Sequence, residues 1–288
     1  MNIKKIAAVT AFSILAVGCL IAFDWPQNET EANSFFSYFG QLRGEQLGTS
    51  LIFNEPSDIK STDKGTIAII LSEHNNETGW FESPLGNAVI VAHNNGLQTV
   101  YGNLEDEGLI SGIEQDISTG TRIGQSGNSG WQEGQSCMEF KVIDTKNKTV
   151  INPRLLMPRI GKELQLTIGE LSLEDKDGKV HYLLNERNFA SGTYSLYHTR
   201  QEIAMPYKTN VSINGTTVEN ILYDKLESHN GKLCAVGNSN YDVKKIYPDA
   251  KRHLLAVVRL TKGHSTLSVT LYDILGATTS ITYNIDVN

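Results

Sequence analysis

Short alternations of apolar and polar residues, separated by turn-forming residues, dominate the chain after residue 47. Runs of this kind occupy residues 50–53, 65–72, 87–93, 98–103, 122–125 and 136–143. They predict strands, because successive side chains of a strand point to opposite faces of its sheet. Turn formers such as HNNG at 93–96 and SGNSG at 126–130 separate the runs. The pattern predicts an all-β domain over residues 47–160.

The second half of the chain shows the same alternation after a proline-rich segment, INPRLLMPRIGKE, at residues 151–163. This segment predicts a domain boundary between residues 160 and 161. Strand-like runs follow at 163–173, 179–184, 193–198, 207–214, 216–223, 253–260, 266–275 and 280–287. Asp-Gly and Asn-Gly pairs in DKDGKV and SINGTTV predict tight hairpin turns. Eight short strands predict an immunoglobulin-like β-sandwich over residues 161–288, although the Cys, Trp, Cys hallmark of that fold is absent.

The first 23 residues have the layout of an export signal or a membrane anchor. Lys4 and Lys5 precede an uncharged stretch over residues 6–23, whose length falls between a signal-peptide core and a membrane span. Within it, LAVGC resembles a bacterial lipoprotein box ending at Cys19. Lipidation at Cys19, an uncleaved anchor and simple cleavage all remain open. Each predicts an exported protein, periplasmic or at the cell surface, held at the membrane by this segment in the first two cases.

Residues 24–46 mix polar and aromatic side chains without a clear period, which predicts a tether with one short helical turn at 35–42. The remaining 242 residues, 47–288, are enough for two domains, each with its own core.

Charge and cysteine content narrow the possible functions. The net charge is −7, and no stretch gathers Lys and Arg on one face, so nucleic acid is excluded as a partner. If Cys19 carries lipid, Cys137 and Cys234 are left. They could pair in an oxidising compartment, but two buried thiols are favoured, because free cysteine behaves as a small hydrophobe.

Five stretches carry a resemblance to a known family. They are GTIAIIL (65–71), GNAVIVAHNNGLQTVYGNL (86–104), ISTGTRIGQSGNSG (117–130), CMEFKV (137–142) and INPRLLMP (151–158). Their order, spacing and glycines resemble the M23 (lysostaphin/LytM-type) peptidoglycan endopeptidases over about ninety residues. The resemblance implies an antiparallel β-sheet core, followed here by the predicted sandwich.

The residues that would carry the family's chemistry are missing. Members hold one zinc with a His and an Asp of an early His-x-x-x-Asp element and with a second His of a His-x-His strand; further histidines serve the reaction. Here no histidine precedes His74. Asn103 replaces the histidine of Tyr-x-His-Leu, and Cys137 and Glu139 replace those of His-x-His. The resemblance therefore implies a degenerate site without catalytic residues, metal or other cofactor.

The leading hypothesis for function is therefore non-enzymatic. The former substrate groove, with Asn103, Cys137, Glu139 and the neighbouring Trp131, would bind peptidoglycan or a cell-envelope partner such as a cell-wall hydrolase. Degenerate members of the family are known to act in this way. In this hypothesis Cys137 packs as a hydrophobe and Glu139 is a solvated groove residue.

Two alternatives remain open. Cys137 and Glu139 are two apart on a strand and share a face, so an active zinc endopeptidase could have relocated its metal site to them, with Asp58 or His93 added. Such a site needs at least three protein ligands. Alternatively, the protein is purely structural, and the sandwich makes the contacts.

Overall fold

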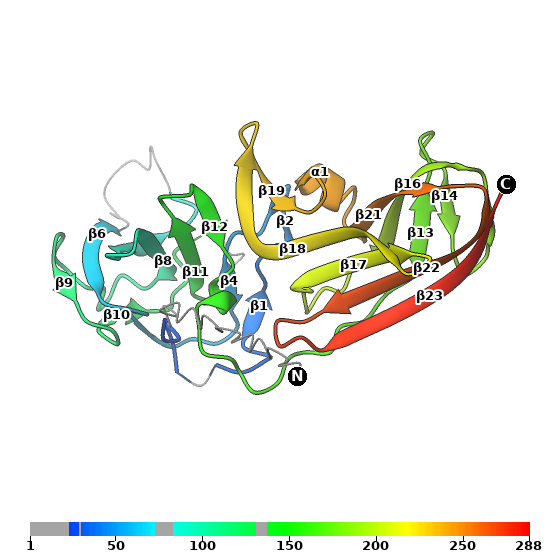
Figure 1. Cartoon of the computed structure of the whole chain (residues 1–288). Coiled ribbons are helices and arrows are strands. Elements are labelled where there is room, and N and C mark those ends of the chain that lie inside the picture. Colours follow the sequence, from blue (N-terminus) through cyan, green and yellow to red (C-terminus); the bar gives the residue numbers. More distant parts are fainter. Residues whose placement is uncertain (1–22, 29, 73–82, 131–136) are drawn as a thin grey trace, which may run out of the picture.

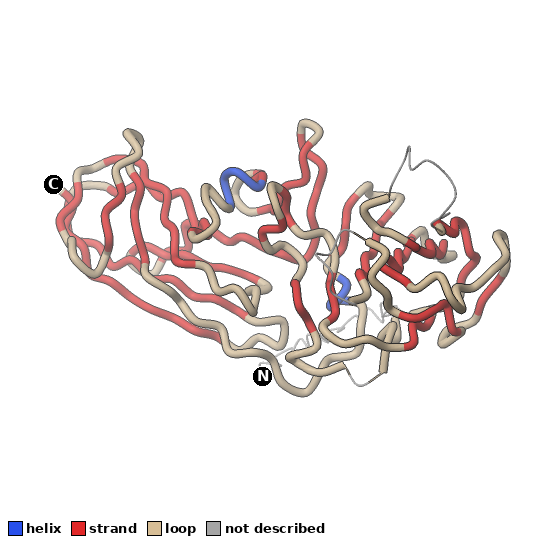
Figure 2. Tube along the Cα trace, turned by 180° about the vertical axis from the view of Figure 1, so that it is seen from behind, coloured by secondary structure: helices blue, strands red, loops and turns tan. Residues whose placement is uncertain are grey.

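Strands form almost all of the regular secondary structure in the computed structural model, which describes residues 23–28, 30–72, 83–130 and 137–288 (Figures 1 and 2). The buried residues form two clusters, one in each half of the elongated molecule. The predicted all-β class is confirmed. Within the described residues, no helix is long and apolar enough to cross a membrane.

The first part is built on an antiparallel sheet. Its successive strands are β6 (Gly65–Leu71), β7 (Asn87–Ala92), β8 (Leu97–Leu104), β11 (Glu139–Asp144) and β12 (Thr149–Ile151), with β9 (Asp116–Ile117) beside β6. Three further strands join or flank it: β4 (Leu51–Phe53) pairs with β11, and β5 (Asp58–Lys60) pairs with β10 (Arg122–Gln125). A 3₁₀ turn, Pro153–Leu155, follows β12. The alternation predicted the main strands to within three residues at the described ends.

The second part is a sandwich of two sheets. One contains β15 (Asn188–Phe189), β23 (Thr278–Val287), β22 (Gly263–Tyr272), β17 (Lys208–Ile213) and β18 (Thr216–His229). The other contains β14 (Val180–Tyr182), β13 (Leu171–Glu174), β16 (Gly192–Thr199) and β21 (Arg252–Leu260). Leucine and valine side chains of both sheets fill the space between them. This order favours the immunoglobulin-like interpretation, which stays a prediction.

Besides the two-residue strand β15, three elements of the second part were not predicted from the sequence. They are β19 (Lys232–Val236), β20 (Asn240–Asp242) and the one-turn helix α1 (Val243–Ile246). They lie beside the long strand β18 and contribute to the core of the first part rather than to the sandwich. The strand predicted at 163–173 is also shorter, because only Leu171–Glu174 is paired.

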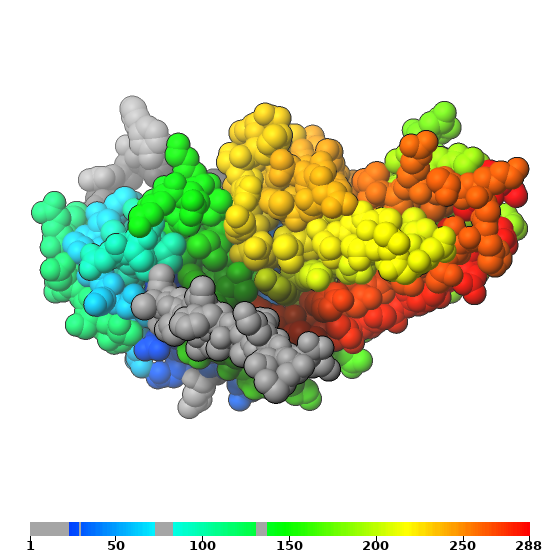
Figure 3. Space-filling model, viewed as in Figure 1, coloured from blue at the N-terminus to red at the C-terminus, as the bar shows by residue number. Residues whose placement is uncertain are grey.

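Pairing between β12 and β18 joins the two parts into one continuous sheet (Figure 1). Val150 faces Leu226 in this antiparallel register. Figure 3 shows the β18 segment, in yellow, lying between the two parts on the visible face. The boundary predicted between residues 160 and 161 stays a prediction, since the sheet crosses from one part to the other without a break.

The segment predicted as a tether instead packs against both parts. Phe35–Ser37 forms strand β1 rather than a helical turn, and it pairs with β4. Two very short strands, β2 (Leu42–Arg43) and β3 (Gln46–Leu47), form a hairpin. The side-chain amide of Gln41 donates to the carbonyl of Glu202 at 3.0 Å. The prediction was wrong because three aromatic residues of this segment, Phe35, Tyr38 and Phe39, are buried, which a composition argument does not reveal.

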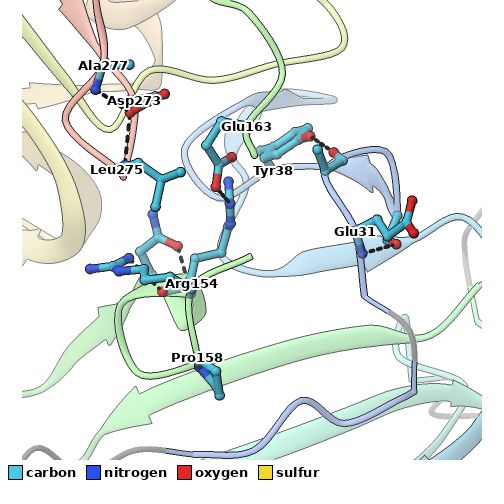
Figure 4. A network of polar contacts seen from close by, with 12 residues as sticks. Glu31, Tyr38, Arg154, Pro158, Glu163, Asp273, Leu275 and Ala277 are labelled. Atoms are coloured by element: carbon cyan, nitrogen blue, oxygen red, sulfur yellow. Dashed lines mark hydrogen bonds and ion pairs between the residues drawn. The ribbon is translucent and has the colours of Figure 1, made fainter. Parts of the chain in front are cut away.

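A buried ion pair lies where the segment, the first part and the sandwich meet (Figure 4). Arg154 donates to the carboxylate of Glu163, and both side chains are less than a tenth exposed. The Arg154 guanidinium also lies over the rings of Phe35 and Tyr38. Burial raises the pKa of Tyr38 to about 12. These contacts fix the proline-rich connection between the two parts.

A second buried network crosses the same junction. The hydroxyl of Tyr223 lies 2.6 Å from Nε2 of His253, whose Nδ1 lies 3.1 Å from Nε2 of His198. Tyr247 stacks on His253 and donates its hydroxyl hydrogen to the carbonyl of Gly40. Burial lowers the pKa of His198 to about 4 and that of His253 well below its ordinary value. Both imidazoles are therefore neutral near pH 7.

Replacing Glu163 with alanine leaves the Arg154 guanidinium buried without its carboxylate. We expect the free energy of unfolding to fall by about 3–5 kcal/mol, as for other broken buried pairs. Chemical denaturation of the full chain measures the change. Glu170→Ala, at an exposed glutamate, is the matched control and should change stability by no more than about 0.5 kcal/mol. Equal effects of the two substitutions would contradict the role given to the pair.

The two buried histidines predict that the free energy of unfolding decreases as the pH is lowered below neutral. Their pKa values are depressed in the folded state, so below about pH 6.5 the unfolded chain binds more protons. Each such group removes about 1.4 kcal/mol per pH unit, down to about pH 4 for His198. Between pH 7 and 4, the free energy of unfolding should change less with pH for His198→Asn than for wild type. The control His229→Asn, at an exposed histidine, should keep the wild-type slope.

Candidate functional site

Asn103, near the end of β8, is wholly buried and bonds to three residues that lie between β10 and β11. Its side-chain amide donates to the carbonyls of Gly127 and Cys137, and its side-chain oxygen accepts the N–H of Gly130 at 2.7 Å. Its backbone adopts φ 60°, a conformation that asparagine tolerates better than most residues. Asn103 therefore acts as a structural connector at the position where the family has a histidine.

Glu139 opens β11 and is also buried, with 3% of its surface exposed. Its Oε1 accepts a hydrogen bond from the hydroxyl of Ser50 at 2.7 Å and lies 2.8 Å from Nη1 of Arg43. The expectation of a solvated glutamate was wrong, because β11 is an interior strand between β4 and β8. Two residues further along, burial lowers the pKa of the Lys141 ammonium, against the opposing effect of Glu139.

Cys137 is buried beside these two residues. Its thiol lies 3.9 Å from the carbonyl of Asn54, and burial, with a smaller contribution from the charge of Glu55, raises its pKa. A raised pKa lowers the thiolate fraction, so this environment does not activate a nucleophile. Cys137 and Cys234 are both buried as thiols.

The other predicted site residues do not join this cluster. Asp58 lies on β5, where it accepts hydrogen bonds from Arg122 and Gln125. His93 is buried, and its ring nitrogens lie within 2.9 Å of the Lys64 carbonyl and the Thr99 hydroxyl. Trp131 and Cys19 lie outside the described residues, as does most of the predicted leader.

Arg43 and Ser50, which contact Glu139, were missed in the sequence, and so was the exposed Gln46 of the same segment. Gln46 and Ser50 have the four-residue spacing of the family's early His-x-x-x-Asp element, which is the signal that could have identified them. Arg43 and Gln46 face each other across the β2–β3 hairpin. Ser50 and Arg43 both contact Glu139, at the second half of the altered His-x-His.

The cluster does not fit the zinc ion that the fold would imply. Zinc requires at least three deprotonated N, O or S ligands. Among the residues described, no three His, Cys, Asp or Glu side chains lie close enough to share an ion. The neutral side chains of Gln46 and Ser50 are poor substitutes, and the carboxylate of Glu139 already faces a guanidinium.

Fold and site together define an all-β protein with a metallopeptidase-type sheet and an altered metal centre. A family model described as peptidase family M23 matches residues 44–153. Through these residues the chain belongs to the M23 family, as a degenerate member. A second family model, of no stated function, matches residues 165–288.

Several known proteins are similar to part of the chain. An uncharacterized protein from Treponema pallidum (strain Nichols) is 32% identical over 133 residues, which cover 43% of this chain and 88% of that protein. A solved chain of the SpoIIIAH–SpoIIQ complex matches with a TM-score of 0.35 and 19% identity, covering 45% of this chain and 95% of that one. The lysostaphin catalytic domain from Staphylococcus simulans gives a TM-score of 0.31 and 20% identity, covering 41% and 88%.

Substitutions at Asn103 test its role as a connector. Asn103→Gly removes the side-chain hydrogen bonds but tolerates the positive φ, and we expect it to lower the free energy of unfolding by about 2–4 kcal/mol. Asn103→Ala should lower it by about 1 kcal/mol more, because alanine disfavours this φ. Denaturant unfolding measures both. Asn230→Gly, at an exposed turn with φ 50°, is the control; a comparable loss there would refute the assignment.

Proposed function

We propose that this chain is a non-catalytic envelope protein that uses its M23-like fold to bind a peptide-containing partner, either peptidoglycan or a cell-envelope protein. The observation that carries the proposal is the internal use of the altered site. Asn103 bonds to Gly127, Gly130 and Cys137, and Glu139 to Arg43 and Ser50, so the groups at the family's histidine positions stabilise the fold.

The proposal places the protein outside the cytoplasm, tethered by its N-terminal segment. The charged start and uncharged stretch of residues 1–23 support this location. Because Asn103, Cys137 and Glu139 are buried, they shape the floor of the former groove. Direct contacts to the partner then come from the exposed edge of the same sheet.

An exposed apolar edge supports such a contact surface. Ile69 on β6 is 44% exposed and Ile113 is 62% exposed. The backbone N–H of Ile67 donates to the carbonyl of Gln115, and the carbonyl of Ile67 accepts from the N–H of Glu114, which aligns the two segments. Among the described strands, β9 pairs with this side of β6 at Gly65 and Thr66, so the part of the edge after Ile67 can pair with another chain.

A relocated zinc site remains the rival from another class. It would require Glu139 to exchange Arg43 for a metal and to find two further ligands. Metal analysis of chain purified without chelator discriminates between the two functions. About one zinc per chain, lost in Glu139→Ala and accompanied by cleavage of cross-linked wall fragments, would replace the proposed function with this one.

The proposed function is tested by measuring how much of the protein is retained on its candidate partners. The full chain in detergent is incubated with purified sacculi or with immobilised envelope proteins, and a heat-denatured sample is the control. We expect retention that drops at least tenfold in the variant Ile69→Lys/Ile113→Lys. Retention equal to the denatured control on both supports contradicts the proposal.

A matched variant addresses the purely structural alternative, in which the sandwich makes the contacts. Tyr182 and Leu184, at the β14 edge of the sandwich, are 43% and 62% exposed. Tyr182→Lys/Leu184→Lys should leave retention unchanged if the M23-like part binds. Loss in this variant alone would assign binding to the sandwich. Deleting the sandwich is not a usable test, because β18 and its neighbours complete the core of the first part.

A further inference from the structure

The inference concerns the positive charge beside the buried carboxylate of Glu139. The carboxylate is 5% exposed and receives both the Ser50 hydroxyl and the Arg43 guanidinium on the same oxygen. A carboxylate without a partner is unfavourable in such a site. In the structure it is the guanidinium of Arg43 that lies against this buried carboxylate.

Local structure explains why Arg43 reaches this point. Gly44 adopts φ 57°, which turns the chain tightly between β2 and β3 and sets Arg43 opposite Gln46. Leu47 is buried and Gly48 bonds back to Gln41, so the hairpin is fixed against the first part. Ser50, three residues after Leu47, is the residue directly before β4. One stretch of chain, residues 43–50, therefore supplies the cation and the hydroxyl together.

We propose that the guanidinium of Arg43 takes the place of the metal ion in this degenerate site. The positions with the spacing of the family's zinc ligands hold Gln46, Ser50 and Glu139. The first two are uncharged, so Glu139 supplies the negative charge among these three positions, and Arg43 pairs with it at 2.8 Å. The inference rests on the proposed loss of catalysis and deepens it.

A covalently held cation has two consequences that a metal ion does not. It cannot be removed by chelators, so the fold is independent of metal supply. A guanidinium also has no open coordination position, so it cannot bind and activate a water molecule as zinc does. Arg43 is a positioning residue for Glu139 and for the β11 strand that carries it.

A double-mutant cycle tests the pairing. Arg43→Met and Glu139→Gln are made singly and together in the full chain, and the denaturant midpoint of each is measured with and without chelator. We expect the shift in the double variant to be clearly smaller than the sum of the single shifts, and no effect of chelator on any protein. Additive shifts would overturn the inference.

Rebuilding the metal site tests whether Arg43 occupies its place. Gln46→His, Ser50→Asp and Glu139→His are combined, once with Arg43 kept and once with Arg43→Met. We expect the Arg43→Met version to bind zinc at least tenfold more tightly by titration. Equal affinities would overturn the inference. If neither version folds, the double-mutant cycle decides.

These experiments separate the inference from the proposed function. Absence of retention on sacculi and envelope proteins would refute the proposed binding and leave the cycle at Arg43 and Glu139 unaffected. Stoichiometric zinc in the wild-type chain would refute both. An additive cycle combined with intact retention would refute only the role of Arg43.

Discussion

The backbone hydrogen bonds between β12 and β18 are the interaction on which the rest of the structure depends. β12 is three residues long and would otherwise be the exposed edge of the M23-like sheet. Exposed strand edges invite pairing with other chains, and β18 covers this one. The long strand then continues into the sandwich, where it pairs with β17. Each part thus completes the other, and neither core is closed without the shared strand.

Two buried carboxylates also hold these parts together, and each is paired with an arginine. Glu163 is matched by Arg154 at the junction and Glu139 by Arg43 in the altered site. Removing one partner from such a pair leaves a buried charge, so each pair fixes which segments lie together. Arg43 belongs to the segment that precedes the sheet, and Arg154 to the connection that leaves it. The ion pairs therefore hold the beginning and the end of the M23-like part in place.

The sequence predicted those features that depend on local pattern. Alternation located the main strands of both parts, and the turn motifs located their hairpins. The packed segment before residue 47 was missed, because its aromatic residues carry no period and acquire their role only against distant strands. The contact of Ser50 with Glu139 joins residues 89 apart in the chain. No local pattern encodes such a pairing, so Asn103, Cys137 and Glu139 were found as altered positions, while the partners of Glu139 were not.

The glycines that this chain shares with the family's motif can be explained by close packing alone, without a role in catalysis. A side-chain carbon at Gly127 would lie 2.5 Å from the backbone nitrogen of Glu105, and one at Gly86 would lie 2.3 Å from the backbone of Ser129. Gly127 lets its loop approach the end of β8 closely enough for Asn103 to bond to it, and Gly86 lets the chain before β7 lie against that same loop. The sheet requires these close approaches whether or not a metal is present. Folding and catalysis thus place separate demands on the family's motif, and this chain keeps the glycines that meet the first while it lacks the histidines that meet the second.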